Sequence, residues 1–197
     1  MTVHKIILIR SISRTCGGYM DLSIGEKVAY PNQGICLVED IEKRLFGANS
    51  VSCYFLRVLR DNSIIFVPTE KAELVGIRPI IGSEQSKNLL GFLAKDFEDV
   101  AADWKIRSRD YSVKLQSGDV FEAADVLKKL SFLSREKKLS FREQTFLEKA
   151  KFLVVSEIAN AILADEDKLS VKIDKLVNKA CEKHCCSQPR VLAATNH

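Results

Sequence analysis

Five short aliphatic runs crowd into the first half of the chain, and their spacing limits the fold more than any other feature. The runs are rich in Val, Ile and Leu, and turn-forming residues such as Asn32, Gln33 and Gly34 separate them. No connection between them is long enough for a crossover helix, so the strands must pair antiparallel. Strands are predicted at Gly25–Pro31, Gly34–Arg44, Val51–Leu59, Ser63–Pro68 and Leu74–Ile81. Such a set predicts a small curled barrel of the SH3 or Tudor type.

Beyond Gly82 the apolar spacing becomes that of helices. Apolar residues recur at three- and four-residue intervals, most clearly from Phe146 to Ile162. Residues suited to cap a helix N-terminus precede four segments: Ser83, Asp103, Asp119 and Ser140. The last two have Glu122 and Glu143 at capping-box spacing. A further helix carries Leu169, Ile173, Leu176 and Ala180. The chain is therefore predicted to be α+β, with its strands first and an all-helical part after them.

These patterns predict a Tudor-like module at residues 20–82 and a helical module at residues 83–183. The polar, unpatterned residues 184–197 are predicted to be a disordered tail. Residues 1–19 contain three basic residues and no acidic one, and they fit neither module. Two interpretations stay open for them, an organellar transit peptide or non-native sequence upstream of a true start at Met20.

Histidine and cysteine usage argues against an enzyme. The three histidines are His4, His184 and His197, so the body of the chain lacks the commonest general base. The six cysteines show no C-x-x-C pair, which fits a reducing compartment. Cys181, His184 and Cys185 would share one helix face and could ligate a metal, and thiol or metal chemistry there is the remaining enzyme alternative. No cofactor or catalytic residue is predicted, and no apolar run is long enough to cross a membrane.

Positive charge gathers in the middle of the predicted helical module. Between Ala101 and Lys151 there are twelve Lys or Arg and eight Asp or Glu residues. Two interpretations fit this excess, a solvated helix surface or a face that follows nucleic-acid phosphates. The basic residues include Lys105, Arg107, Arg109, Lys114, Lys128, Lys129, Arg135, Lys137, Lys138 and Arg142.

Trp104, the one tryptophan, stands at the predicted start of a helix and is followed by Lys105, Arg107 and Arg109. A tryptophan in a helical protein is often a core residue. At the first turn of a helix and beside cations, an indole could instead project and wedge against bases while the cations hold phosphates. Residue chemistry alone leaves both interpretations open.

The order of several segments resembles the CarD/CdnL family of bacterial transcription regulators. These segments are IGEKVAYPNQGICLVEDIE, FVPTEKAELVGIRPII, the lone Trp before Arg residues, SGD and LSFREQTFLEKAK. The resemblance extends from about Met20 to Leu163, which also favours Met20 as the native start. The β module of this family is shared with the RNA-polymerase-binding domain of the transcription–repair coupling factor.

The resemblance implies a cytoplasmic, monomeric, non-enzymatic factor that is associated with the nucleoid through RNA polymerase. In such proteins the Tudor-like module docks on the polymerase β subunit. The helical module contacts promoter DNA at the upstream edge of the melted bubble, with a sigma factor nearby, and a Trp wedge in the minor groove stabilises the open complex. Carried over by position, the DNA-binding residues are Trp104, Lys105, Arg107, Arg109 and Lys149, and the polymerase-binding residues are Arg44, Ile64 and Phe66. The resemblance thus implies that Trp104 faces outward.

The sequence departs from the family pattern at two of these places. Phe66 stands where many relatives have an arginine, and Ile106 replaces one arginine of the usual run after the Trp. A function of another class also stays open, that of a repair-associated adaptor that binds polymerase through the β module and another protein through the helices.

Overall fold

The computed structural model describes residues 21–46 and 49–187. The interpretations of residues 1–19 and of a start at Met20 lie outside these residues. The strands are β1 (Lys27–Tyr30), β2 (Gly34–Phe46), β3 (Asn49–Val58), β4 (Ile64–Pro68) and β5 (Arg78–Pro79), with a short 3-10 turn, η1, at Thr69–Lys71. The helices are α1 (Ser83–Leu93), α2 (Trp104–Gln116), α3 (Val120–Glu136), α4 (Phe141–Ile162) and α5 (Glu166–Ser187).

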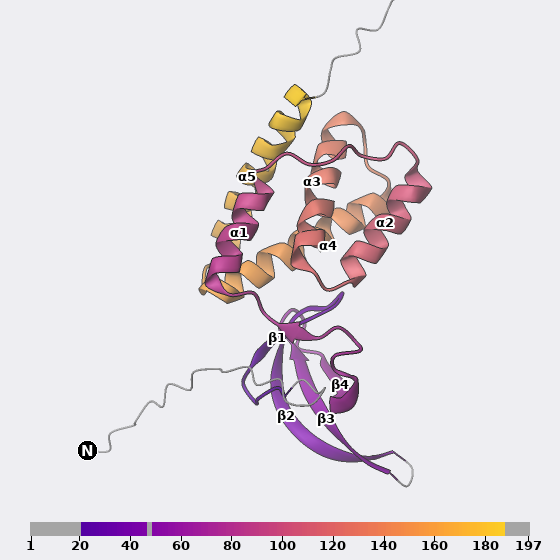
Figure 1. Cartoon of the computed structure of the whole chain (residues 1–197), viewed down its shortest axis with the longest axis vertical. Coiled ribbons are helices and arrows are strands. Elements are labelled where there is room, and N and C mark those ends of the chain that lie inside the picture. Colours follow the sequence, from indigo (N-terminus) through magenta and orange to yellow (C-terminus); the bar gives the residue numbers. More distant parts are fainter. Residues whose placement is uncertain (1–20, 47–48, 188–197) are drawn as a thin grey trace, which may run out of the picture.

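The strands form one antiparallel sheet of five strands in the order β4-β3-β2-β1-β5, which confirms the predicted α+β class and Tudor-like module. Figure 1 shows the sheet below the helices, with the long β2–β3 hairpin pointing away from them. The last predicted strand is reduced to Arg78–Pro79. Gly76 has a φ of +83°, and the Val75 and Ile77 N–H groups donate back to the carbonyls of Lys71 and Ala72. The chain therefore turns here before it pairs with β1.

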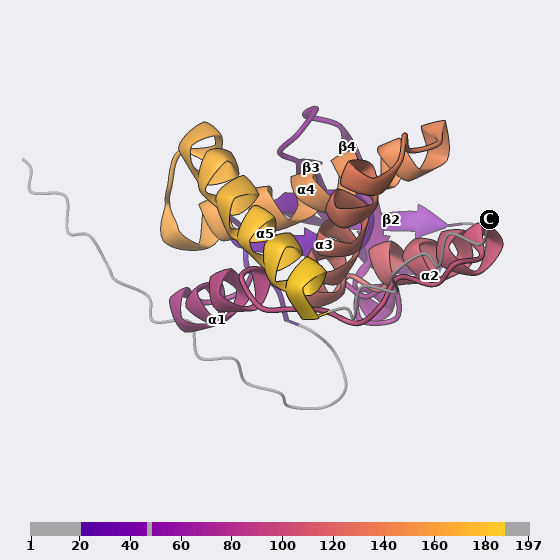
Figure 2. The same cartoon turned by 90° about the horizontal axis from the view of Figure 1, so that it is seen from above.

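Each part of the molecule has its own apolar core. Val28, Val38 and Leu56 are central to the core of the sheet, whereas Leu130 and Ile158 are central to the core that the helices share. Seen from above in Figure 2, α2 and α5 lie on different sides of α3. Two separate cores allow each part to present a surface of its own while the junction between the parts determines how those surfaces are related.

Three of the predicted helix caps are present, and one is displaced. The side chains of Asp103 and Asp119 accept from the N–H groups two residues later, at 2.7 and 2.8 Å. Ser140 forms the predicted reciprocal capping box with Glu143, whereas Asp119 caps its helix without the predicted box to Glu122. Ser83, predicted as a cap, is the first helical residue instead. The cap is Gly82, whose N–H donates to the Gln85 side chain at 3.2 Å.

Helix α5 passes the predicted end of the helical module at residue 183. It continues to Ser187, so the predicted tail at 184–197 begins too early. The reason is His184, which is buried and stacks on Phe97 at 4.2 Å between ring centroids, with the edge of Phe132 at 4.9 Å. This packing gives the last turn of the helix apolar contacts that residue spacing alone did not reveal.

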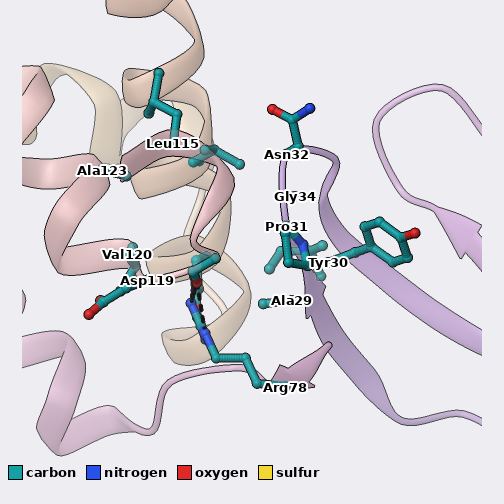
Figure 3. A pocket seen from close by; sticks show the side chains of 14 residues that line it. Ala29, Tyr30, Pro31, Asn32, Gly34, Arg78, Leu115, Asp119, Val120 and Ala123 are labelled. Atoms are coloured by element: carbon teal, nitrogen blue, oxygen red, sulfur yellow. Dashed lines mark hydrogen bonds and ion pairs between the residues drawn. The ribbon is translucent and has the colours of Figure 1, made fainter. Parts of the chain in front are cut away.

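The junction between the sheet and the helices centres on Arg78. Its guanidinium donates to the Gly118 carbonyl at 2.9 and 2.7 Å and forms a two-pronged ion pair with Glu157 on α4. Glu157 also accepts from the Ile81 N–H at 3.2 Å. In Figure 3, Pro31 and Asn32 of the sheet face Leu115 and Ala123 of the helices across a small pocket beside these bonds. The two parts are thus joined by partly buried, directional contacts.

The approach at this junction is close. A Cβ atom added at Gly34 would lie 2.8 Å from the Phe152 ring of α4, and the φ of Gly34 is +91°. Both observations favour glycine, because a side chain would strain the backbone and would collide with α4. Lys27 adds a hydrogen bond from β1 to Asn160 of α4 at 2.8 Å.

Candidate nucleic-acid interface

Trp104 is the first residue of α2, and its side chain is 58% exposed. The Asp103 cap ends the preceding segment in an extended conformation and begins the helix directly at the tryptophan. The indole therefore faces outward, as the family resemblance implied. Ile106 is also exposed, so the outer side of the first turn is partly apolar.

Of the three cations that follow Trp104, two are exposed and one is not. Lys105 and Arg109 lie at the surface. Arg107 is 4% exposed, and the prediction that it contacts DNA is corrected by this burial. Its guanidinium donates to the carbonyls of Ala101 and Ala102 at 2.7 and 2.6 Å. Arg107 thus fixes the segment just before Trp104, and its guanidinium is not available to contact a ligand.

The same guanidinium pairs with Glu143 of α4 at 2.9 Å. Burial acts to raise the pKa of Glu143, but hydrogen bonds from Arg107 and Ser140 outweigh it and lower the pKa to about 2. The carboxylate therefore stays charged at all physiological pH values. Because Arg107 and Glu143 each lie in the first turn of a helix, their ion pair holds the N-termini of α2 and α4 side by side.

Sequence reasoning missed Phe141, the first residue of α4, which is 90% exposed. It stands two residues before Glu143, so the Arg107–Glu143 pair brings the helix turn that carries it next to the turn that carries Trp104. One signal could have found it. Phe141 lies outside the apolar stripe that starts at Phe146, directly between the Ser140 cap and Arg142. An aromatic residue outside the buried stripe of a helix has no core to fill.

The basic excess of residues 101–151 does not form one continuous face. Lys128 is fully buried and donates to the Phe92 carbonyl at 3.2 Å, with its ammonium 3.7 Å from the centroid of the Phe92 ring. Lys114 and Lys129 each form an ion pair with Asp125 at 2.9 Å. These three lysines are bonded to other groups of the helical module, which leaves fewer cations for a ligand than composition indicated.

Lys149, also predicted to contact DNA, lies on α4 at the junction rather than beside Trp104. It is half-buried, and its ammonium donates to the Asn32 side chain of the β1–β2 turn. Burial and the nearby Arg60 lower the pKa of Lys149. The structure therefore brings Lys149 together with residues of the β module, eight positions along α4 from Phe141.

The three residues predicted to bind polymerase lie together on the β module. The Arg44 guanidinium is 4.3 Å from the centroid of the Phe66 ring and 4.8 Å from that of Phe55. Phe66 and Phe55 meet edge to face at 4.6 Å, and Ile64 is two residues before Phe66 on β4, on the same side of the strand. Arg44, Ile64 and Phe66 are all exposed. They form an apolar patch with one cation above it, on the outer part of the sheet.

The described residues contain no group of three or more metal-ligating side chains placed to hold an ion. Cys181, one of the three residues considered for a metal, is buried with its thiol 3.9 Å from the Lys128 carbonyl. His184 lies 2.9 Å from Asp96 and 3.5 Å from Asp99. Within the same residues, no helix has the length and apolarity that crossing a bilayer requires.

Two family models match this chain, and the boundary between the two matches coincides with the boundary between the two apolar cores. Residues 22–81 match the family described as the CarD-like/TRCF RID domain, and residues 88–174 match the CarD C-terminal domain. The chain is also similar to the Bacillus subtilis (strain 168) protein named "Putative transcription factor YdeB". The two are 27% identical over 135 residues, which cover 68% of this chain and 88% of the relative. The chain therefore belongs to the CarD-like family of transcription factors.

Proposed function

We propose that this protein is a non-enzymatic regulator that binds the RNA polymerase β subunit through its β module and stabilises the promoter open complex through its helical module. The observation that carries the proposal is the placement of Trp104, an exposed indole at the start of α2 with Lys105 and Arg109 exposed beside it. A flat apolar ring flanked by cations suits the edge of a melted duplex, where a base step is open and phosphates lie on both sides.

In this mechanism Trp104 inserts at the upstream edge of the bubble and takes the place of lost base stacking. Unstacking a base step costs a few kcal/mol, and a side chain that fills the gap lowers the free energy of the open state. Phe141 supplies a second apolar surface from the neighbouring helix turn. Lys105 and Arg109 contact phosphates, which adds affinity but no sequence preference.

Arg107 acts as a positioning residue in this proposal. Its bonds to Ala101, Ala102 and Glu143 hold the loop before Trp104 and the start of α4 in one arrangement. A wedge is effective only if it is held rigidly, because a mobile side chain loses entropy when it is inserted.

On the β module, Arg44, Ile64 and Phe66 form the proposed surface for the polymerase. Phe66, which replaces the arginine of many relatives, lies under the Arg44 guanidinium at 4.3 Å. The patch therefore keeps a single cation, backed by aromatic rings, and its contact with polymerase combines apolar burial with one charge pair. The β module tethers the protein, and the helical module acts on DNA.

The decisive experiment is the lifetime of open complexes on a promoter with an unstable bubble, with wild-type protein and with Trp104→Ala. We expect the wild type to extend the lifetime and Trp104→Ala to lose most of this effect while it still binds polymerase. Equal effects of the two proteins would contradict the wedge. A protein that binds polymerase but leaves the lifetime unchanged would instead be an adaptor for another partner.

A further inference from the structure

One side of α4, exposed at Arg142 and partly buried from Phe146 to Phe152, carries alternating cations and aromatic rings. Arg142, Phe146, Lys149 and Phe152 follow one another at three- or four-residue intervals, so they share a face of the helix. The Arg142 guanidinium lies 5.5 Å from the centroid of the Phe146 ring. We call this row the α4 stripe. Its ten-residue span corresponds to about 15 Å along the helix axis.

The α4 stripe continues onto the β module through Arg60. This residue stands in the turn between β3 and β4, is exposed, and has its guanidinium 4.8 Å from the centroid of the Phe152 ring. Beside it, Lys149 donates to Asn32 in the β1–β2 turn. Two cations from α4 and one from the β3–β4 turn therefore lie on the same side of the junction.

No carboxylate lies within salt-bridge distance of these three cations, Arg60, Arg142 and Lys149, in the described part of the chain. Lys151, only two residues from Lys149, pairs with Asp174 at 2.8 Å. The acidic side chain next to Arg60 is Asp61, and its carboxylate accepts from the Ser63 N–H at 2.9 Å.

Arg60 and Lys149 also lie close enough to repel each other. Burial and the charge of Arg60 together disfavour the ammonium form of Lys149. An anion placed between the two cations would relieve this repulsion, which makes the end of the α4 stripe a receptive place for negative charge. The nearest bonded partner of Lys149, the Asn32 side chain, is neutral.

Position favours DNA over an acidic segment of the polymerase as the source of that anion. The α4 stripe starts at Arg142, next to Phe141 in the turn held beside Trp104. About 15 Å of duplex axis carries roughly four phosphates on each strand, which suits a row of spaced cations. The proposed polymerase surface is centred on the contact between Arg44 and Phe66, whereas Arg60 lies in the turn after β3 and against Phe152 of α4.

From these contacts we infer that the α4 stripe and Arg60 hold the phosphate backbone of the promoter duplex that adjoins the Trp104 site. This inference rests on the proposed function and extends it. It makes the β module a DNA-contacting element as well as a tether. Arg60, from the β module, and Lys149, from the helical module, contact successive phosphates of the same backbone.

The test is the salt dependence of binding to two preformed targets, polymerase alone and the polymerase–promoter open complex, with a fluorescently labelled full-length chain. On the open complex, Arg60→Ala should lower the slope of log K against log salt by about one, and Arg60→Ala with Lys149→Ala by about two. Arg60→Lys keeps the charge and should keep the slope. The matched control is Lys151→Ala, which removes a neutralised charge from the same helix and should leave the slope unchanged. Affinity for polymerase alone should be the same for all of these proteins.

Two results would overturn the inference while the proposed function stands. In the first result, Arg60→Ala and Lys151→Ala show the same slope of log K against log salt on the open complex, while Trp104→Ala still weakens binding to it. The other is a loss of affinity for polymerase alone in Arg60→Ala, which would assign the cation to an acidic segment of the polymerase. If promoter DNA does not tighten binding of the wild-type chain at all, the proposed function itself fails. Melting curves of Arg60→Ala and Lys151→Ala provide the folding control.

Discussion

The Arg107 guanidinium lies 2.9 Å from the Glu143 carboxylate, with both side chains nearly excluded from solvent. This contact links two helices that are 36 residues apart in the chain at that point. It also separates Arg107 from Lys105 and Arg109, its exposed neighbours in sequence, because only Arg107 points into the space between α2 and α4.

Replacing Arg107 should therefore destabilise the protein. In Arg107→Ala, Glu143 is left charged without its partner, and the carbonyls of Ala101 and Ala102 lose their donors. Breaking a buried pair by removing one partner costs about 3–5 kcal/mol. Urea denaturation measures the loss. The matched control, Arg109→Ala, removes an exposed cation of the same helix and should change the free energy of unfolding by about 0.5 kcal/mol or less. Equal stabilities of the two variants would contradict the buried role of Arg107.

The same pair should make stability depend on pH in the acid range. The pKa of Glu143 is about 2 when folded, below its ordinary value, so the folded state binds fewer protons at this site than the unfolded state. Its contribution is fully present above about pH 4.5 and is lost as the pH falls toward 2. The difference in free energy of unfolding between wild type and Glu143→Gln should shrink over this interval. Glu148→Gln, an exposed change on the same helix, is the control, and a constant difference for Glu143→Gln would refute the assignment.

Trp104 and Tyr111 offer a contrast within one helix. Trp104 is exposed and Tyr111 is buried, so the two alanine variants should separate function from folding. Trp104→Ala should change the free energy of unfolding by less than about 1 kcal/mol, whereas Tyr111→Ala should cost about 3–5 kcal/mol through loss of core packing. Thermal melting provides this comparison. A strong loss of stability in Trp104→Ala would mean that the indole has a core role.

The proposed polymerase surface predicts a different set of losses. Phe66→Ala should weaken binding to the polymerase β subunit and leave folding intact, because the ring is at the surface of an edge strand. Arg44→Glu should weaken binding by about 2–5 kcal/mol if its charge is paired and buried in the complex. Leu74→Ala, at an exposed apolar residue elsewhere on the module, is the control. Binding unchanged by both Phe66→Ala and Arg44→Glu would assign the docking to another edge of the sheet.

Local signals in the sequence were sufficient for much of the fold. The caps at Asp103, Asp119 and Ser140 depend on residues within three positions, and the antiparallel sheet follows from strand spacing. Gly82 in place of Ser83 shows the usual margin of one residue at a helix start.

The candidate site was less accessible to sequence reasoning, because its arrangement depends on how α2 and α4 are rotated against each other. Arg107 and Arg109 are the same type of residue, two positions apart on the same helix. The position of Glu143 in space distinguishes the buried arginine from the exposed one. Arg60 and Phe152 are 92 residues apart in sequence, and their contact exists only because the sheet docks on α4. No local pattern encodes such a meeting.

The bonds of Arg78 to Gly118 and Glu157 hold the sheet and the helices at a fixed distance from each other. If the outer sheet is fixed on polymerase and the tip of α2 and α4 rests on DNA, a stiff junction sets the distance between these two points. The position of polymerase on the promoter then determines where the Trp104 indole is inserted. The protein needs no base-specific contacts at that place. A regulator built in this way serves many promoters with one geometry, and the response of each promoter reflects how readily its own duplex opens at that fixed distance.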